Sequence, residues 1–201
     1  MPYSRKRAPA VPADVSARLH PTVFDELSSK GWNQINIRQI ATRSGVSSAT
    51  IYKYYGSKEQ LVLAVVDEWV GELMQAVIEH VADARSYRDK WYRLFQAQLG
   101  FSDRNPQFAI LTTIHIPGTI WFSASTMPTR MIQRVYKPLL REGRRLGVID
   151  SRITTEHLIR QVYMNTIHET QRWYAHGQKW SLASRVDDFF FMFWKAISAT
   201  A

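Results

Sequence analysis

The stretch from Asn36 to Lys58, NIRQIATRSGVSSATIYKYYGSK, constrains the fold of this chain more than any other segment. Apolar residues recur at helical spacing on both sides of Gly45, which predicts two short amphipathic helices joined by a tight turn. Glycine suits such a turn because it adopts backbone angles that other residues disfavour. Short polar side chains that can cap a backbone N–H stand at three expected helix starts: Asn36, Ser47 and Ser57.

The second helix of this pair carries polar side chains on the face that points away from the small core. Ser48 and Ala49 are small enough to let the start of the helix approach base edges, while hydroxyl and lysine side chains can contact phosphates. The pattern therefore predicts a DNA-binding surface. The alternative is a helix pair that only packs, with solvated tyrosines. The candidate DNA contacts are Arg38, Ser47, Ser48, Ala49, Thr50, Tyr52, Lys53, Tyr54 and Lys58.

The segment GVSSATIYKYYGSKEQL, preceded by IRQIATRS, resembles the DNA-binding segment of the TetR family of bacterial transcription regulators. The resemblance implies an all-α fold, in which an N-terminal three-helix helix-turn-helix domain precedes a larger helical domain for ligand binding and dimerisation. On this basis we expect a basic arm over residues 1–12, the DNA-binding domain over 13–58 and the effector-binding and dimerisation domain over 59–201. Pro21 departs from the family pattern, so the first helix is expected either to begin near it or to be kinked there.

Charge supports a polyanionic partner. The net charge is +9, and residues 1–58 contain nine Lys/Arg against three Asp/Glu, so the excess lies beside the helix pair. Taken alone, a basic balance fits an anionic membrane surface as well as double-stranded DNA. The chain has no cysteine and no apolar N-terminal segment of signal-peptide length, from which we expect a cytoplasmic protein that does not associate with a membrane.

Residues 105–129 contain no Asp, Glu, Lys or Arg, but prolines and polar residues interrupt any run long enough to span a bilayer. We therefore expect short buried helices here. Packing in a core is the default interpretation of their aromatic and methionine side chains, and a cavity is considered only because the family resemblance implies a small-molecule effector. For a hydrophobic or aromatic effector, the candidate contacts are Phe95, Phe108, Leu111, His115, Trp121, Met127, Met131 and Tyr163.

The last two expected helices begin near Thr154 and Ser181, and the second of them is apolar around most of its circumference. One neighbouring helix cannot cover such a surface, so a homodimer is predicted; a thick monomeric core is the alternative. The candidate interface residues are Ile159, Tyr163, Ile167, Val186, Phe190, Phe193 and Trp194.

The six histidines are scattered, and neither a paired metal-binding spacing, a glycine-rich phosphate loop nor a nucleophile elbow is present. We expect no cofactor, no metal and no enzymatic activity. The sequence thus predicts a ligand-responsive transcription regulator, most simply a repressor that binds a palindromic operator as a dimer. A DNA-binding dimer whose second domain is a filled scaffold is the main alternative, and an enzyme with a DNA-binding-like domain is a remote one.

Overall fold

The computed structural model describes residues 10–116 and 131–199, and the candidate residues Trp121 and Met127 lie outside these ranges. The described chain is helical, apart from one isolated β-bridge between Ile149 and Ser198. The all-α class predicted from the sequence is therefore confirmed. No helix of the described ranges is long and apolar enough to cross a bilayer.

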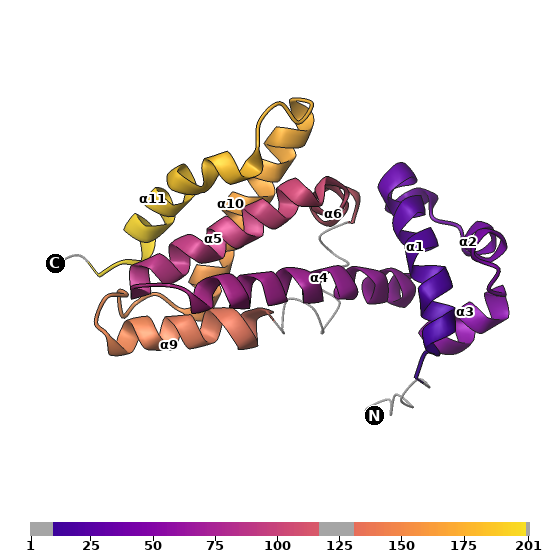
Figure 1. Cartoon of the computed structure of the whole chain (residues 1–201), viewed down its shortest axis with the longest axis horizontal. Coiled ribbons are helices and arrows are strands. Elements are labelled where there is room, and N and C mark those ends of the chain that lie inside the picture. The colour runs from indigo at the N-terminus through magenta and orange to yellow at the C-terminus, as the bar shows by residue number, and fades with distance from the viewer. Residues whose placement is uncertain (1–9, 117–130, 200–201) are drawn as a thin grey trace.

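Three helices and a single 3-10 turn form the N-terminal part (Figure 1): α1 (Ala13–Lys30), η1 (Trp32–Gln34), α2 (Ile37–Ser44) and α3 (Ser48–Tyr55). α1 passes through Pro21, which is exposed, instead of beginning there. Leu19, Val23 and Leu27 of α1 are fully buried against Ile40 of α2 and Ile51 of α3. This small core holds the two helices of the predicted pair in place.

The long helix α4 (Lys58–Ala82) joins the two parts of the molecule (Figure 1). Its first half contributes Leu61 and Val65 to the N-terminal core, whereas Met74 and Val77 belong to the second core. A displacement of α4 in one core is therefore transmitted to the other, because a continuous helix is stiff over this length.

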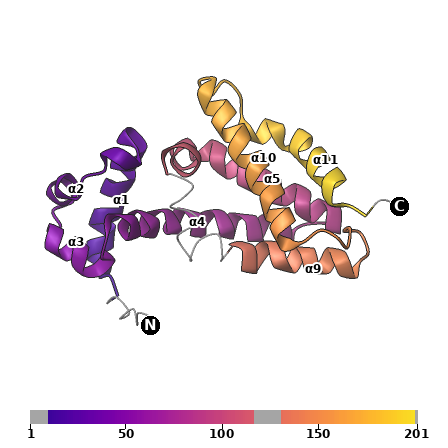
Figure 2. The same ribbon diagram turned by 180° about the vertical axis from the view of Figure 1, so that it is seen from behind.

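The second part packs α5 (Tyr87–Arg104) between α4 and the C-terminal helices (Figure 2). The remaining elements are α6 (Pro106–Ile110), the π-helical turn η2 (Leu111–His115), the π-helical turn η3 (Ile132–Tyr136), α9 (Lys137–Arg145), α10 (Thr155–Ala175), η4 (Leu182–Arg185) and α11 (Val186–Ile197). The Ser86 and Thr154 side chains each accept a hydrogen bond from a first-turn backbone N–H, so the helix start expected near Thr154 is confirmed.

The helix type changes just before Pro138. The π-helical turn η3 ends at Tyr136, and Pro138 occupies the first turn of α9, where a missing N–H leaves few intrahelical bonds unmade. Tyr136 is almost fully buried and stacks on Trp91 at a centroid distance of 6.4 Å. The π turn thus places a large aromatic side chain in the second core.

Candidate nucleic-acid interface

Local capping fixes the two helices of the DNA-binding pair. Asn36 Oδ1 accepts a hydrogen bond of 2.9 Å from the backbone N–H of Arg38, and Ser47 Oγ accepts one of 3.1 Å from that of Thr50. Gly45 ends α2 with φ of 67°, a left-handed conformation that favours glycine. The turn and the start of α3 therefore follow from local sequence chemistry.

The structure divides α3 into a packed face and an outer face. Ile51 is fully buried and Tyr55 is 8% exposed, whereas Tyr52 is 51% exposed and Ala49 and Lys53 are also exposed. α3 lies at the outer end of the molecule, away from the second core (Figure 1). A duplex can therefore reach the outer face of this helix without any rearrangement.

The remaining candidate DNA contacts surround this face. Ser48, Thr50 and Tyr54 are half-buried, while Ser47, in the turn before the helix, and Arg38, in the first turn of α2, are exposed. Lys58 is half-buried, with its ammonium 4.7 Å from the ring centroid of Trp32 and 3.4 Å from the carbonyl oxygen of the same residue. These contacts hold Lys58 near the end of α3, the expected recognition helix.

Sequence reasoning missed Arg18 of α1. Its guanidinium lies 3.4 Å from the Gly45 carbonyl oxygen, in the turn between α2 and α3, and more than half of its side chain is exposed. The side chain therefore adds a cation beside the recognition helix from a different part of the chain. No local motif signals this residue, because only the packing of α1 across the pair brings it there.

A second missed feature links α3 to α4 through α1. His20 Nε2 is 2.7 Å from the Tyr55 hydroxyl, and His20 Nδ1 is 2.8 Å from Glu68 Oε1. Burial, followed by the charge of Glu68, raises the pKa of Tyr55 to about 12, so the phenol stays protonated at neutral pH. Three helices thereby meet at one polar bridge at the end of the recognition helix.

A buried carboxylate joins α1 to α2. Glu26 is 1% exposed, lies 2.7 Å from Lys30 Nζ and also pairs with Arg43. Hydrogen bonding to Lys30, followed by that to Arg43, lowers the pKa of Glu26 although burial opposes the shift. The paired charge makes burial of the carboxylate tolerable and fixes the orientation of α2.

Comparison with known proteins decides the family. The model of the family described as bacterial regulatory proteins, tetR family, matches residues 24–65, which include the C-terminal part of α1, all of α2 and α3, and the start of α4. The chain belongs to the TetR family of transcriptional regulators. It is thus a DNA-binding regulator, and the helix-turn-helix predicted from Asn36 to Lys58 is confirmed.

Relatives of this TetR family regulator extend beyond the DNA-binding part. It is 25% identical over 178 residues to the nucleoid occlusion factor SlmA of Pasteurella multocida, covering 79% of this chain and 86% of the relative. It is 23% identical over 167 residues to the fatty acid metabolism regulator protein of Bacillus subtilis, covering 79% and 82%. The relationship therefore spans both cores.

Solved structures show the same fold. The fatty acid degradation regulator FadR of Bacillus halodurans superposes with a TM-score of 0.76 at 16% identity, over 92% of this chain and 97% of that one. FadR of Bacillus subtilis in complex with stearoyl-CoA superposes with a TM-score of 0.75 at 16% identity, over 88% and 96%. At these identities the likeness establishes the arrangement of helices.

The candidate effector residues that the structure describes divide between the two cores and the surface. Phe95 and Met131 are buried in the second core, whereas Phe108 and Leu111 are buried in the N-terminal core. His115 Nδ1 is 3.0 Å from the Leu27 carbonyl oxygen of α1, so its imidazole contacts the DNA-binding part. Tyr163 is 37% exposed on α10.

Two cavities among the described residues are open at the surface. One has a volume of about 390 Å³ and lies beside α1 and α2, where polar side chains line it: Asp25, Ser28, Ser29, Arg43 and Gln107. The other is an apolar groove beside α4 and α9. Within the described ranges, no group of three or more acidic or histidine side chains has a geometry suited to a metal ion.

The candidate interface residues of α10 and α11 divide between the subunit core and its surface. Val186, Phe190 and Phe193 are at most 4% exposed and pack in the second core, while Ile159, Ile167 and Trp194 are half-buried. The large apolar side chains most open to solvent on these helices are Met164, Phe191 and Met192, which are 62%, 62% and 54% exposed. Sequence periodicity predicts this division, because Phe190 and Phe193 fall on one broad apolar face at helical spacing, and Phe191 and Met192 lie outside it.

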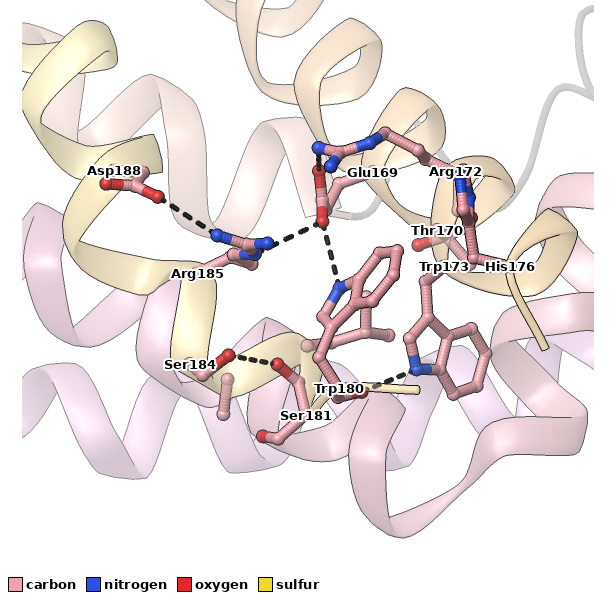
Figure 3. A network of polar contacts seen from close by, with 12 residues as sticks. Glu169, Thr170, Arg172, Trp173, His176, Trp180, Ser181, Ser184, Arg185 and Asp188 are labelled. Atoms are coloured by element: carbon pink, nitrogen blue, oxygen red, sulfur yellow. Dashed lines mark hydrogen bonds and ion pairs between the residues drawn. The ribbon is translucent and has the colours of Figure 1, made fainter. Parts of the chain in front are cut away.

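A polar network fixes α10 relative to α11 (Figure 3). Buried Glu169 of α10 accepts a hydrogen bond of 3.0 Å from Trp180 Nε1, and its carboxylate lies 3.4 Å from Arg172 and 3.6 Å from Arg185. Both guanidiniums lie within 5.5 Å of the Trp180 ring centroid. The network therefore links the C-terminal half of α10 to the segment that leads into α11.

Proposed function

We propose that this protein is a dimeric, ligand-responsive transcription regulator that represses genes by binding an approximately palindromic operator. The observation that carries the proposal is the exposed outer face of α3, with Ala49, Tyr52 and Lys53 on a helix whose start is fixed by the Ser47 cap. Such a helix fits the major groove. Residues 13–58 would bind DNA, with α4 carrying the response from residues 59–201.

The proposed contacts differ in role. Ser48 and Ala49, at the start of the recognition helix, contact base edges, and Arg38 contacts a base or a phosphate. Thr50, Tyr52, Lys53, Tyr54 and Lys58 contact phosphates and set the register. The basic arm over residues 1–12 adds electrostatic attraction to this end of the molecule.

Dimerisation supplies the second recognition helix. We propose that α10 and α11 pair with their copies about a two-fold axis, because Met164, Phe191 and Met192 leave an apolar surface exposed on both helices. Two-fold symmetry then requires half-sites separated by about 34–36 Å, one helical turn of DNA, or by a multiple of this distance.

Selection of bound fragments from random duplex DNA at moderate salt tests the DNA-binding proposal. The expected result is an enriched approximate palindrome with one half-site per subunit. Lys53→Gln should weaken binding to the operator and to other duplexes alike. It should also reduce the slope of log affinity against log salt by about 1, since one phosphate contact is lost. Ala49→Ser should instead change the preferred sequence.

Lys179→Gln is the matched control, because Lys179 is exposed in the connection between α10 and η4, outside the proposed DNA-binding surface. It removes one positive charge without touching the proposed surface. Equal losses in Lys179→Gln and Lys53→Gln would mean that overall charge, and not the outer face of α3, determines binding. Absence of any enriched sequence would contradict the proposed function itself.

The second candidate function is a DNA-binding dimer whose C-terminal domain is a filled scaffold and binds no ligand. Trp91, Phe95 and Tyr136 fill the centre of the second core, and Trp91 and Phe95 are fully buried there. This packing favours a domain that only dimerises. The similarity to FadR in complex with stearoyl-CoA supports the sensing alternative, in which the effector is an apolar molecule with a long acyl chain. Titration of acyl compounds into the operator complex separates the two candidates.

A further inference from the structure

An open apolar groove runs between the second half of α4 and the start of α9. Its volume is about 290 Å³, close to the lower limit of ordinary small-molecule sites. The apolar side chains of its walls come from both sides: Val77, Ile78 and Val81 from α4, and Val135, Pro138 and Leu139 from η3 and α9. In Figures 1 and 2, α9 lies alongside this half of α4.

Part of this apolar lining is exposed to water. Ile78 is 40% exposed, and Pro138 is also exposed on the opposite wall. Transfer of apolar surface from water to an apolar environment is favourable, so the groove gains from an apolar occupant. By contrast, Trp91 and Phe95 in the second core are fully buried.

Positive charges border the groove. Arg134 lines it, is exposed, and has no acidic partner among the residues that the structure describes. Lys137 and Arg141 follow at helical spacing toward the C-terminal end of α9, so the three cations share one side of this helix. Lys90 also lines the groove, but its ammonium is 2.7 Å from Glu142 Oε1, which largely neutralises its charge.

We propose that this groove is the effector site and that it binds an alkyl chain with an anionic head group. The chain lies between Ile78 and Pro138, and the carboxylate or phosphate of the head group contacts Arg134. A neutral aromatic molecule would form no ion pair with Arg134. This inference rests on the proposed function, because it locates the sensor of a ligand-responsive regulator.

The position of the groove provides a route to DNA. Val77 and Val81 belong to α4, whose first turns pack Leu61 and Val65 in the N-terminal core. An alkyl chain inserted between α4 and α9 separates these helices, and the continuous helix passes the displacement to the DNA-binding part. Operator affinity then falls by the ratio of ligand affinities for the two conformations.

Four probes test the chemistry by isothermal titration calorimetry, each below its critical micelle concentration: laurate, lauroyl-CoA, dodecanol and coenzyme A without an acyl chain. We expect laurate, lauroyl-CoA or both to bind, and the two compounds distinguish a carboxylate from a phosphate head group. Dodecanol and coenzyme A should bind at least tenfold more weakly. Dodecanol that binds as tightly as the tighter-binding of laurate and lauroyl-CoA would contradict the contact with Arg134.

Two substitutions test the location. Ile78→Trp places a large side chain in the groove and should abolish probe binding, while Arg134→Gln should weaken it about tenfold, the loss expected for one charge-assisted contact. Lys179→Gln again serves as the charge-matched control. Ile78 and Arg134 are both exposed, so the variants should keep the thermal stability and ligand-free operator affinity of the wild type.

The outcomes separate this proposal from the proposed function. If the ligand-free protein selects an operator but Ile78→Trp and Arg134→Gln bind the probes as tightly as the wild type, the groove is not the site. The same conclusion follows if no probe binds. If the ligand-free protein selects no operator, the regulatory function fails, whatever the calorimetry shows.

Discussion

The hydroxyl of Tyr55, in the last turn of the recognition helix, lies 2.7 Å from Nε2 of His20 in α1. The other ring nitrogen of His20 is 2.8 Å from Glu68 of α4. The Tyr55 hydroxyl and His20 Nε2 form a hydrogen bond, whereas His20 Nδ1 lies near the Glu68 carboxylate without the geometry of a hydrogen bond. The end of α3 is thereby tied to the helix that connects both cores.

Tyr55→Phe tests this link with minimal change of shape. We expect the free energy of unfolding to fall by about 1 kcal/mol, because one hydrogen bond is lost and His20 Nε2 stays partly buried. Operator affinity should fall as well, since the end of α3 is held less firmly. Chemical denaturation and operator titration measure the two effects. Tyr52→Phe is the matched control for stability, because the Tyr52 side chain is exposed.

Alkaline pH should lower the free energy of unfolding through the titration of Tyr55. The pKa of Tyr55 is raised by burial to about 12, and burial likewise raises the pKa of Tyr87 to about 12. The folded state therefore retains these protons more strongly than the unfolded state, in which tyrosine titrates near 10. The stabilisation is complete below pH 10 and is lost as pH rises from 10 to 12. Denaturation at several pH values should show a smaller loss in Tyr55→Phe.

The ion pairs of Glu26 with Lys30 and Arg43 predict that the free energy of unfolding also falls in acid. The pKa of Glu26 is lowered, chiefly by the hydrogen bond from Lys30, so the stabilisation is present above the unfolded pKa near 4.5 and is lost as pH falls through the folded value. Replacing both partners, Lys30→Met with Arg43→Met, leaves a buried unpaired carboxylate and should cost about 3 kcal/mol. Glu26→Gln should lower the free energy of unfolding by less, and it should reduce the loss of stability at acid pH. A double variant as stable as the wild type would contradict this account.

The sequence predicted features that depend on neighbouring residues. Ser47, Ser57 and Thr154 cap helices as expected, because a cap requires only a short polar side chain and the next turn. Pro21 shows the limit of local reasoning. Its effect on a helix is unfavourable taken alone, but Leu19, Val23 and Leu27 are fully buried on either side of it, and this packing maintains a continuous α1.

Features that depend on distant contacts were not predicted. The expected effector residues included Phe108 and Leu111 because their segment is apolar, but both pack in the N-terminal core. Similarly, periodicity separates Phe193 from Phe191 on α11 but does not show which face the subunit's own core covers, so the expected interface residues included the buried Phe193. The contact of Arg18 with the Gly45 carbonyl arises only from the packing of three helices.

Phe191→Asp tests the proposed dimer surface. The side chain is 62% exposed in the subunit, so the substitution should leave the subunit folded, whereas a buried unpaired carboxylate in a two-fold contact should prevent dimerisation. Sedimentation should show a monomer that binds the palindrome much more weakly. Leu146→Asp, at an apolar side chain 47% exposed at the end of α9, is the control and should remain dimeric. A dimeric Phe191→Asp variant would place the interface elsewhere.

Two glycines in helices should respond to alanine in opposite directions. A Cβ on Gly143 of α9 would lie 2.2 Å from the Tyr87 hydroxyl oxygen and 2.4 Å from Ile149 Cγ1, while Gly71 of α4 has open space. Tyr87 donates a hydrogen bond of 2.8 Å to the Leu139 carbonyl oxygen and accepts one from Trp91, so it cannot retreat without losing both. Gly143→Ala should therefore cost at least about 2 kcal/mol through overpacking. Gly71→Ala should add up to about 1 kcal/mol through helix propensity, and thermal unfolding of the two variants measures both changes.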